Sequence, residues 1–298
     1  MSIYNLKTKY KKTISDDATK LLSIGHIKWK DNRFNRVMHM HEDQIEILLV
    51  AHGTGTHLID GVRYQVTDGD IIVHDAGVMH EEDRSDDLRT DIRYIAAHVD
   101  QNNIHLGSTS ANRLVPNGVS PVICSARHFH SIYYMMQEMY DNIDKTIVQM
   151  SEDDAIHMHI TEMNHYMLKA IIMMVMELYT EAEPKRSSDE DVLGHRIRMY
   201  LDEHFLEEIV IQDIADSLNI NKFYLSHIFK KMTGISPMAY ATRHRIGDAQ
   251  GLLLETDMNV AEIAYKVGFN STNHFSKMFT KFTGTTPGHF RKFRQENM

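Results

Sequence analysis

The chain has 298 residues, of which 42% are hydrophobic and 24% charged, which is ordinary for a globular protein with room for two domains. Its longest apolar run, AIIMMVM at 170–176, is far shorter than the ~20 residues of a membrane span, and its polar, basic N-terminus lacks the pattern of a signal peptide. The single cysteine, Cys124, excludes an internal disulfide, so we expect a cytoplasmic protein with no membrane partner.

Charge is unevenly distributed along the chain. The net charge of −9 argues at first against a nucleic-acid partner. However, residues 1–187 have a balance of −8, whereas residues 210–298 carry 11 Lys and Arg against 7 Asp and Glu. The asymmetry therefore leaves a nucleic-acid partner open for the C-terminal region.

Residues 20–115 show short alternating apolar runs separated by turn signals. Glycine-rich and Asp-Gly turns are predicted at 53–55, 60–61 and 68–69, between strands of five to seven residues. This spacing indicates antiparallel strands in a sandwich or barrel. If HMHEDQIE at 39–46 is extended, His39 and His41 point to the same face.

Apolar residues recur at helical spacing between 121 and 183. The pattern predicts two amphipathic helices that separate near DNIDKTIVQMSEDD. Methionine is frequent here and makes adaptable packing surfaces. The two helices are expected to form an intradomain hairpin, a dimer interface, or both. The following segment EAEPKRSSDED, at 181–191, is the best candidate for a linker.

The region beyond this segment contains an internal repeat. DIADSLNINKFYLSHIFKKMTGISPMAY (213–240) matches EIAYKVGFNSTNHFSKMFTKFTGTTPGHF (262–290), mostly at an offset of 50 residues. Each copy is predicted to fold as a helix, a tight turn and a second helix. In the second copy, Asn259 and Glu262 predict a capping box and Gly268 a left-handed helix end; the next helix is expected from about Ser271 to Phe282.

An apolar stripe orients the second helix of each copy. The residues expected to face inward are Leu225, Ile228, Phe229 and Met232 in the first copy, and Phe275, Met278, Phe279 and Phe282 in the second. The residues expected to face outward are Phe223, Ser226, His227 and Lys230, and Asn273, Ser276, Lys277 and Thr280. Small polar and basic side chains on an exposed helix face suit the major groove of DNA.

One long helix, predicted over Pro237–Glu255, joins the two copies. It would span about 27 Å, near the ~34 Å between successive major grooves on one face of DNA. An all-helical bundle with a solvated basic face is the alternative, but two joined helix-turn-helix patterns favour DNA binding.

The segment VAEIAYKVGFNSTNHFSKMFTKFTGTTPGHFRK closely resembles the signature of the AraC/XylS family, and the resemblance covers about 195–294. It implies that Phe223, Ser226 and His227 read bases in the first copy, and that Asn273, Ser276 and Lys277 do so in the second. Lys222 and Lys230 complete the predicted DNA-contacting set. His227 stands where relatives often carry a long basic residue.

HMHEDQIEILLVAHG followed by GDIIVHDAGVMH resembles the two cupin motifs. The resemblance implies a barrel in which four ligand-type residues meet: His39, His41, Glu46 and His80. Arg33 and Asp75 stand where the motifs usually have Gly and Pro, and neither change removes a ligand.

Three interpretations of these four residues stay open. The favoured one is an effector pocket that hydrogen-bonds a polar ligand without metal. In the second, a divalent transition metal (Fe, Mn, Ni, Zn or Cu) is bound and helps to hold or sense the effector. In the third, the barrel is a metalloenzyme such as an isomerase or dioxygenase, which a shared fold does not establish. His74 alternates with Ile72 and is expected to be a structural histidine.

The sequence thus predicts an α+β protein of two domains. The expected order is a cupin-like sensing domain (1–120), a helical dimerisation region (121–183), a linker (184–191) and an all-α domain with two helix-turn-helix motifs (192–298). The expected function is that of a ligand-responsive, sequence-specific regulator of transcription, an activator rather than a repressor, and not an enzyme. Its expected partners are double-stranded DNA, a sugar or other small polar effector, a second copy of the chain and, for an activator, RNA polymerase.

Overall fold

The computed structural model describes residues 2–5, 19–27, 37–83, 90–99, 114–124, 127–149, 154–184 and 188–295. The strands in these ranges are β1 (Ser2–Asn5), β2 (Thr19–Ile27), β3 (Ile45–Ile59), β4 (Val62–Thr67), β5 (Ile71–His74), β6 (His80–Asp83), β7 (Thr90–Val99) and β8 (Val122–Ile123). The helices are α1 (Phe129–Gln149), α2 (Asp154–Thr180), α3 (Asp189–His204), α4 (Ile211–Ser217), α5 (Lys222–Thr233), α6 (Pro237–Glu255), α7 (Val260–Lys266), α8 (Thr272–Thr283) and α9 (Pro287–Gln295).

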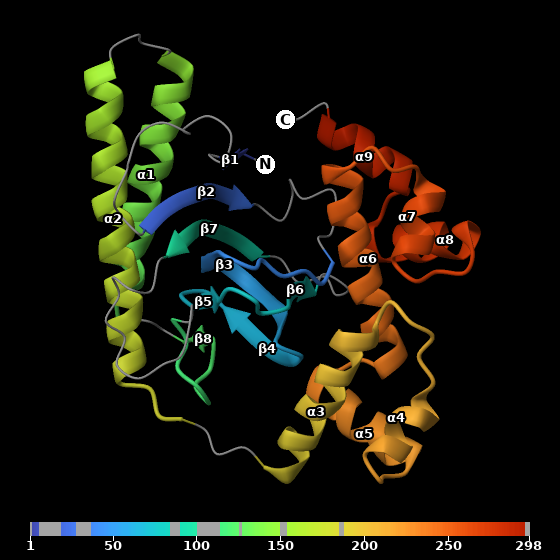
Figure 1. Cartoon of the computed structure of the whole chain (residues 1–298). Helices are drawn as coiled ribbons and strands as arrows, with labels where there is room; N and C mark the ends of the chain where they lie inside the picture. The colour runs from blue at the N-terminus through green and yellow to red at the C-terminus, as the bar shows by residue number, and fades with distance from the viewer. Residues whose placement is uncertain are drawn as a thin grey trace.

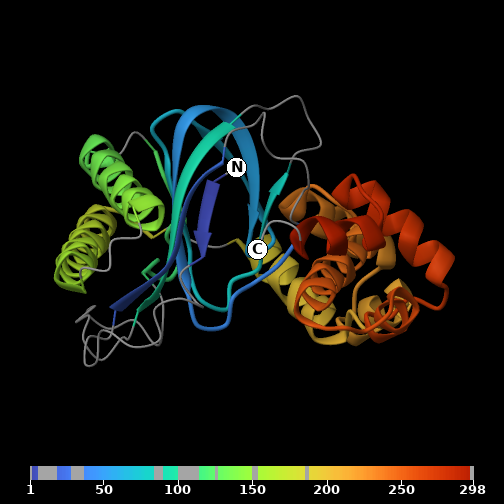
Figure 2. The same ribbon diagram turned by 90° about the horizontal axis from the view of Figure 1, so that it is seen from above.

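These elements form three layers. Helices α1 and α2 lie against one side of the β-structure, and helices α3 to α9 lie on the opposite side (Figures 1 and 2). The strands pair antiparallel in the order β1-β2-β7-β3-β5-β8, with β4 and β6 also paired to β3. The predicted antiparallel barrel, followed by an all-helical C-terminal region, is confirmed.

Strand β3 corrects one prediction. The turn predicted at 53–55 is wrong, because β3 continues through it and bends instead. Gly53 has φ of 99°, and the register with β7 shifts between Val50 and His52. Beyond Gly53 the strand leaves β7 and pairs with β4 and β6. The glycine therefore supplies a bend in a shared strand, which is a common use of glycine in barrels.

The other two predicted turns are confirmed. Asp60 (φ 51°) and Gly61 (φ 76°) connect β3 to β4 as a two-residue hairpin with both central residues left-handed. Gly69 (φ 88°) lies between β4 and β5. These local turns have the backbone signs that their residue types favour.

Alternation along the strands divides the apolar residues into two cores. Leu48 and Val50 belong to the core enclosed by the strands, whereas Ile47 and Leu49 belong to the core shared with α1 and α2. By the same alternation Glu46 points with Leu48 into the barrel. The helical hairpin is thus an integral part of the N-terminal fold, and it also leaves an outer face available.

The C-terminal helices reproduce the predicted repeat. Helices α4 and α5 form one helix-turn-helix unit, α7 and α8 form the other, and α6 joins them over the predicted residues. The capping box of Asn259 and Glu262 and the left-handed Gly268 (φ 83°) are confirmed. Helix α3 begins at Asp189, within the segment suggested as a linker, and residues 185–187 lie outside the described ranges.

Within the described residues, no helix combines the length and apolar character needed to cross a bilayer.

Candidate functional site

Helix α5 is held with one face out of the core. The side chain of Asn221 caps its first turn by accepting from Phe223 N at 2.7 Å, and left-handed Gly234 ends it. Leu225 and Phe229 are fully buried, so the opposite face points to solvent. Phe223 is 74% exposed there, an unusual position for a large aromatic side chain unless it meets a partner.

Helix α8 presents an equivalent face. Ser271 caps its start by accepting from His274 N, and Gly284 (φ 78°) ends it, as in α5. Phe275 and Phe279 are the buried counterparts of Leu225 and Phe229. In the predicted DNA-contacting set, the exposed members are Lys222, Phe223, His227, Lys230, Asn273 and Lys277, and the partly buried members are Ser226 and Ser276.

Helix α6 fixes the two units relative to each other. Tyr240 and Ile246 of this helix are fully buried, and the Tyr240 hydroxyl donates to Asp202 Oδ1 of α3 at 2.9 Å. The guanidinium of Arg245 donates to two carbonyl oxygens after α3, those of Phe205 and Glu207. The two exposed faces are therefore carried by one rigid support, which favours simultaneous contact with a long ligand.

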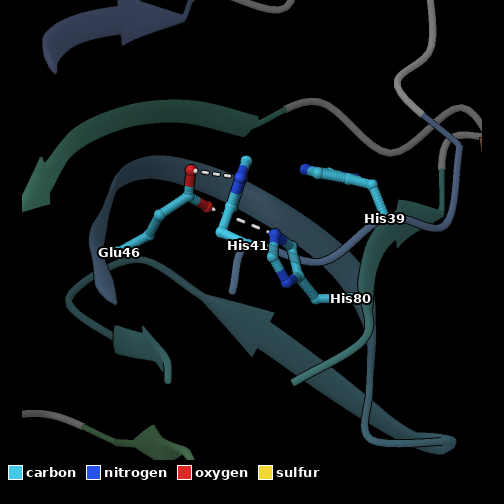
Figure 3. Close-up of side chains that lie close together, drawn as sticks. All are labelled: His39, His41, Glu46 and His80. Carbon is cyan, nitrogen blue, oxygen red and sulfur yellow. Dashed lines mark ion pairs between the residues drawn. The ribbon is translucent and has the colours of Figure 1, made fainter. Parts of the chain in front are cut away.

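The second site lies in the barrel. His39 and His41 precede β3, Glu46 lies near its start and His80 begins β6 (Figure 3). His39 and His80 form an antiparallel bridge. One ligand-type atom from each of the four residues lies within 4.8 Å of the others. We refer to His39, His41, Glu46 and His80 as the histidine cluster.

Glu46 is the centre of the cluster. Its Oε1 lies 3.2 Å from His41 Nε2, and its Oε2 lies 3.3 Å from His80 Nε2 (Figure 3). Burial raises the pKa of Glu46, but contacts with the imidazoles of His41, His74 and His80 together hold it well below its ordinary value. Glu46 is consequently an anionic group inside the barrel.

His74 is a neighbour that sequence reasoning did not assign to this site. Its Nδ1 lies 3.3 Å from Glu46 Oε2, and its ring stacks on His80 with centroids 3.9 Å apart. Burial, the largest cause, lowers the pKa of His74 to about 3, so the ring is neutral near pH 7. The two residues are brought together by the β3–β5 pairing, which sets Glu46 opposite His74 and leaves no local signal in the sequence.

The tautomers suggest why the cluster suits a cation. His80 Nδ1 is 2.9 Å from Val78 O, and His39 Nδ1 is 3.2 Å from Val37 O. A carbonyl oxygen only accepts, so each Nδ1 must carry a proton. In a neutral His80 ring, Nε2 is then an acceptor that faces the Glu46 carboxylate, another acceptor. A cation bound between them would accept electron pairs from both groups.

The residue types and spacing of the histidine cluster fit a metal ion. Three imidazole nitrogens and one carboxylate form a donor set that suits first-row transition metals. The hydrogen bonds from His39 and His80 to backbone carbonyls are of the kind that orient metal-binding histidines.

Asp75 and Arg33 are the two residues that depart from the cupin motifs. Asp75 accepts from Leu114 N at 2.7 Å and from Val115 N at 3.1 Å, so its carboxylate anchors the segment that follows the barrel. Arg33 lies outside the described residues.

Comparisons with known proteins agree with this architecture. A helix-turn-helix domain model matches residues 214–292, and a cupin domain model matches residues 31–88. The transcriptional activator RhaS of Enterobacter sp. (strain 638) is 26% identical over 87% of this chain and 88% of its own. The solved C-terminal domain of AraT, a response regulator from Geobacillus stearothermophilus, is 33% identical over 36% of this chain and 88% of that chain, with a TM-score of 0.34.

A cupin domain joined to a double helix-turn-helix domain defines a two-domain DNA-binding regulator of transcription, not an enzyme. The chain belongs to the AraC/XylS family.

Proposed function

We propose that this regulator activates transcription from sites read by α5 and α8, in response to a small polar effector held in the barrel. The duplicated, exposed helix faces carry the DNA part of this proposal, and the similarity to transcriptional activators named RhaS supports activation. A sugar is the effector class suggested by the sugar-responsive branch of the family. Activation implies contact with RNA polymerase in the cytoplasm.

Base reading is assigned to the polar residues of the two exposed faces. Lys277 on α8 is the most direct test, because an exposed lysine at this face can reach a base edge. Lys277→Ala is expected to weaken specific binding by about 1–3 kcal/mol, with a changed preference at one position of the site. Lys20→Ala, an exposed lysine on β2, is the control. An unchanged site preference would remove Lys277 from the set.

Dimerisation is assigned to α1 and α2, the predicted region 121–183. On α2, Met163, Tyr166 and Met173 are 39%, 68% and 68% exposed, and Tyr134 of α1 is 68% exposed. Apolar residues that recur on one outer face of a helix are typical of subunit contacts. Tyr166→Glu is expected to yield monomers in sedimentation, while Met199→Glu, at an exposed methionine of α3, is not. A monomeric wild-type chain would overturn this assignment.

A metal-linked form of sensing is the second candidate. The observation that favours it is the donor set itself, because one ligand-type atom from each of the four residues of the histidine cluster lies within 4.8 Å of the others. His39, His41, Glu46 and His80 would hold the ion, which would supply a positive charge and a coordination position for an oxygen of the effector.

Elemental analysis of the purified chain tests this second candidate. Near one transition metal per chain is expected, with loss in a His39→Ala/His80→Ala variant and retention in His52→Ala, an exposed histidine outside the cluster. A chain without metal after reconstitution would leave the histidines as the lining of an effector pocket.

A further inference from the structure

The C-terminal helices α3 to α9, here called the helical domain, share a hydrophobic core with one edge of the barrel. Val37, Met38, Leu58 and Met79 are all at most 6% exposed, and they cluster with buried residues of α3 and α6. In both views the helical domain lies beside the barrel on the side away from α1 and α2 (Figures 1 and 2). Burying these apolar side chains stabilises the docked arrangement of the two domains.

Polar contacts define where docking occurs. Val37 N donates to Gln250 Oε1 of α6 at 2.8 Å, although the two residues are 213 positions apart. Arg243 Nη1 of α6 donates to Glu81 Oε1 of β6 at 2.8 Å, with both side chains largely buried. A buried ion pair needs both partners, because either charge alone would be left without solvent. These contacts are therefore specific to the docked state.

Gly247 permits the closest approach between the domains. A Cβ atom at this position would lie 1.7 Å from the carbonyl oxygen of Met38 and 2.8 Å from its carbonyl carbon. Backbone atoms cannot yield as a flexible side chain can, so even alanine would force the domains apart. Gly251 lies one turn further along α6, and its Cβ would meet no atom within 4 Å.

The docking residues and the histidine cluster alternate along the same two segments. Met38 joins the interdomain core and His39 the cluster; Met79 joins the core and His80 the cluster. Two backbone hydrogen bonds, His39 N to His80 O at 3.0 Å and His80 N to His39 O at 2.9 Å, tie the segments together. A shift of either segment would consequently alter docking and the cluster at once.

We propose that this His39–His80 bridge couples the cluster to docking of the helical domain. Docking on Met38 and Met79 holds the histidine-bearing segments in the arrangement of the cluster, and a ligand bound there stabilises the docked state. The two effects must be equal in free energy, because coupling between sites is reciprocal. The ligand half of this inference rests on the sensing role proposed above for the cluster.

Two glycine substitutions in α6 test the coupling in the full-length chain. Gly247→Ala should raise amide hydrogen exchange at His39 and His80 by about ten-fold or more, because undocking releases the bridge. Gly251→Ala should leave both amides protected as in the wild type, because a Cβ at this position meets no atom of the barrel. Both variants gain the same helix propensity from alanine, so this gain does not distinguish them. Protection of Phe229 in the core of the helical domain should persist in both variants and report an intact fold. Unchanged protection of His39 and His80 in Gly247→Ala would overturn the proposal.

Titration with Zn²⁺ tests whether docking of the helical domain changes the affinity of the histidine cluster for a ligand. Gly247→Ala should bind Zn²⁺ more weakly than the wild type, and Gly251→Ala should bind it equally well. Equal affinity in all three proteins would overturn the coupling. A wild-type chain that takes up no Zn²⁺ would contradict the metal-linked function alone, and the hydrogen-exchange result would still decide whether docking holds the bridge.

Discussion

His244 of α6 predicts an acid sensitivity of the helical domain. Its side chain is 7% exposed, and its ring stacks on Phe205 with centroids 3.6 Å apart. Burial, the largest cause, lowers the pKa of His244 from 6.5 to about 4. Asp202 and Asp248 face the ring at 4.0 and 3.8 Å, and Asp202 is also paired with Arg198.

The sign of the effect follows from the depressed pKa. Below pH 6.5 the unfolded chain binds a proton at His244, whereas the folded chain binds one only near pH 4. Stability is therefore lost as the pH falls through this window, by up to about 3 kcal/mol and by about 2 kcal/mol at pH 5. His244→Phe keeps an aromatic ring against Phe205 and removes the titrating group.

Urea unfolding followed by helical circular dichroism at pH 7.5 and pH 5.0 measures this difference. The wild type should lose about 2 kcal/mol more than His244→Phe over this interval. Burial raises the pKa of Asp248 to about 6, which acts in the opposite direction, but Asp248 is present in both proteins and cancels in the comparison. His204→Phe, at a half-buried position of α3, controls for loss of an imidazole. Equal pH dependence in the wild type and His244→Phe would show that protonation of His244 does not cause the acid sensitivity.

Further predictions concern the turns, the cluster and DNA. Gly284→Ala should lower the free energy of unfolding by about 1 kcal/mol, because alanine is strained in the left-handed conformation. Gly268→Ala should lower it further, because its Cβ would also lie 2.5 Å from Leu206 O. Equal losses in denaturant would contradict this packing argument. His74→Phe should weaken Zn²⁺ binding by about 10–100-fold through the loss of its contact with Glu46, and an unchanged titration would make His74 structural only. The affinity for DNA should fall steeply between about 50 and 200 mM salt, and a flat response in a filter assay would exclude phosphate contacts.

Local signals explain what the sequence predicted well. The capping box at Asn259, the left-handed glycine at 268 and the apolar stripe of α8 each depend on residues within a few positions of one another. Such features are read directly from spacing. The duplicated helix-turn-helix fold followed from these signals, although the roles of its exposed residues stay predictions.

Long-range pairing explains the rest. Gly53 was predicted to lie in a turn because no nearby residue indicates that β3 pairs first with β7 and then with β4 and β6. His74 contacts Glu46 of the histidine cluster only because the register of β5 with β3 sets the two residues opposite each other. The close approach of Gly247 to Met38 joins two separate domains. Nothing in the helical pattern around Gly247 indicates that this position must be glycine. Sequence spacing carries no direct information on such pairs.

The most direct measurement is selection of binding sites by the full-length chain from a library of randomised DNA duplexes. We expect one enriched sequence with two short half-sites about one helical turn (~10 base pairs) apart, read by α5 and α8. A Ser276→Ala/Lys277→Ala variant should lose preference in one half-site and retain it in the other. A pool without enrichment, or a variant that selects the wild-type sequence unchanged, would contradict the assignment of these two helices to DNA recognition.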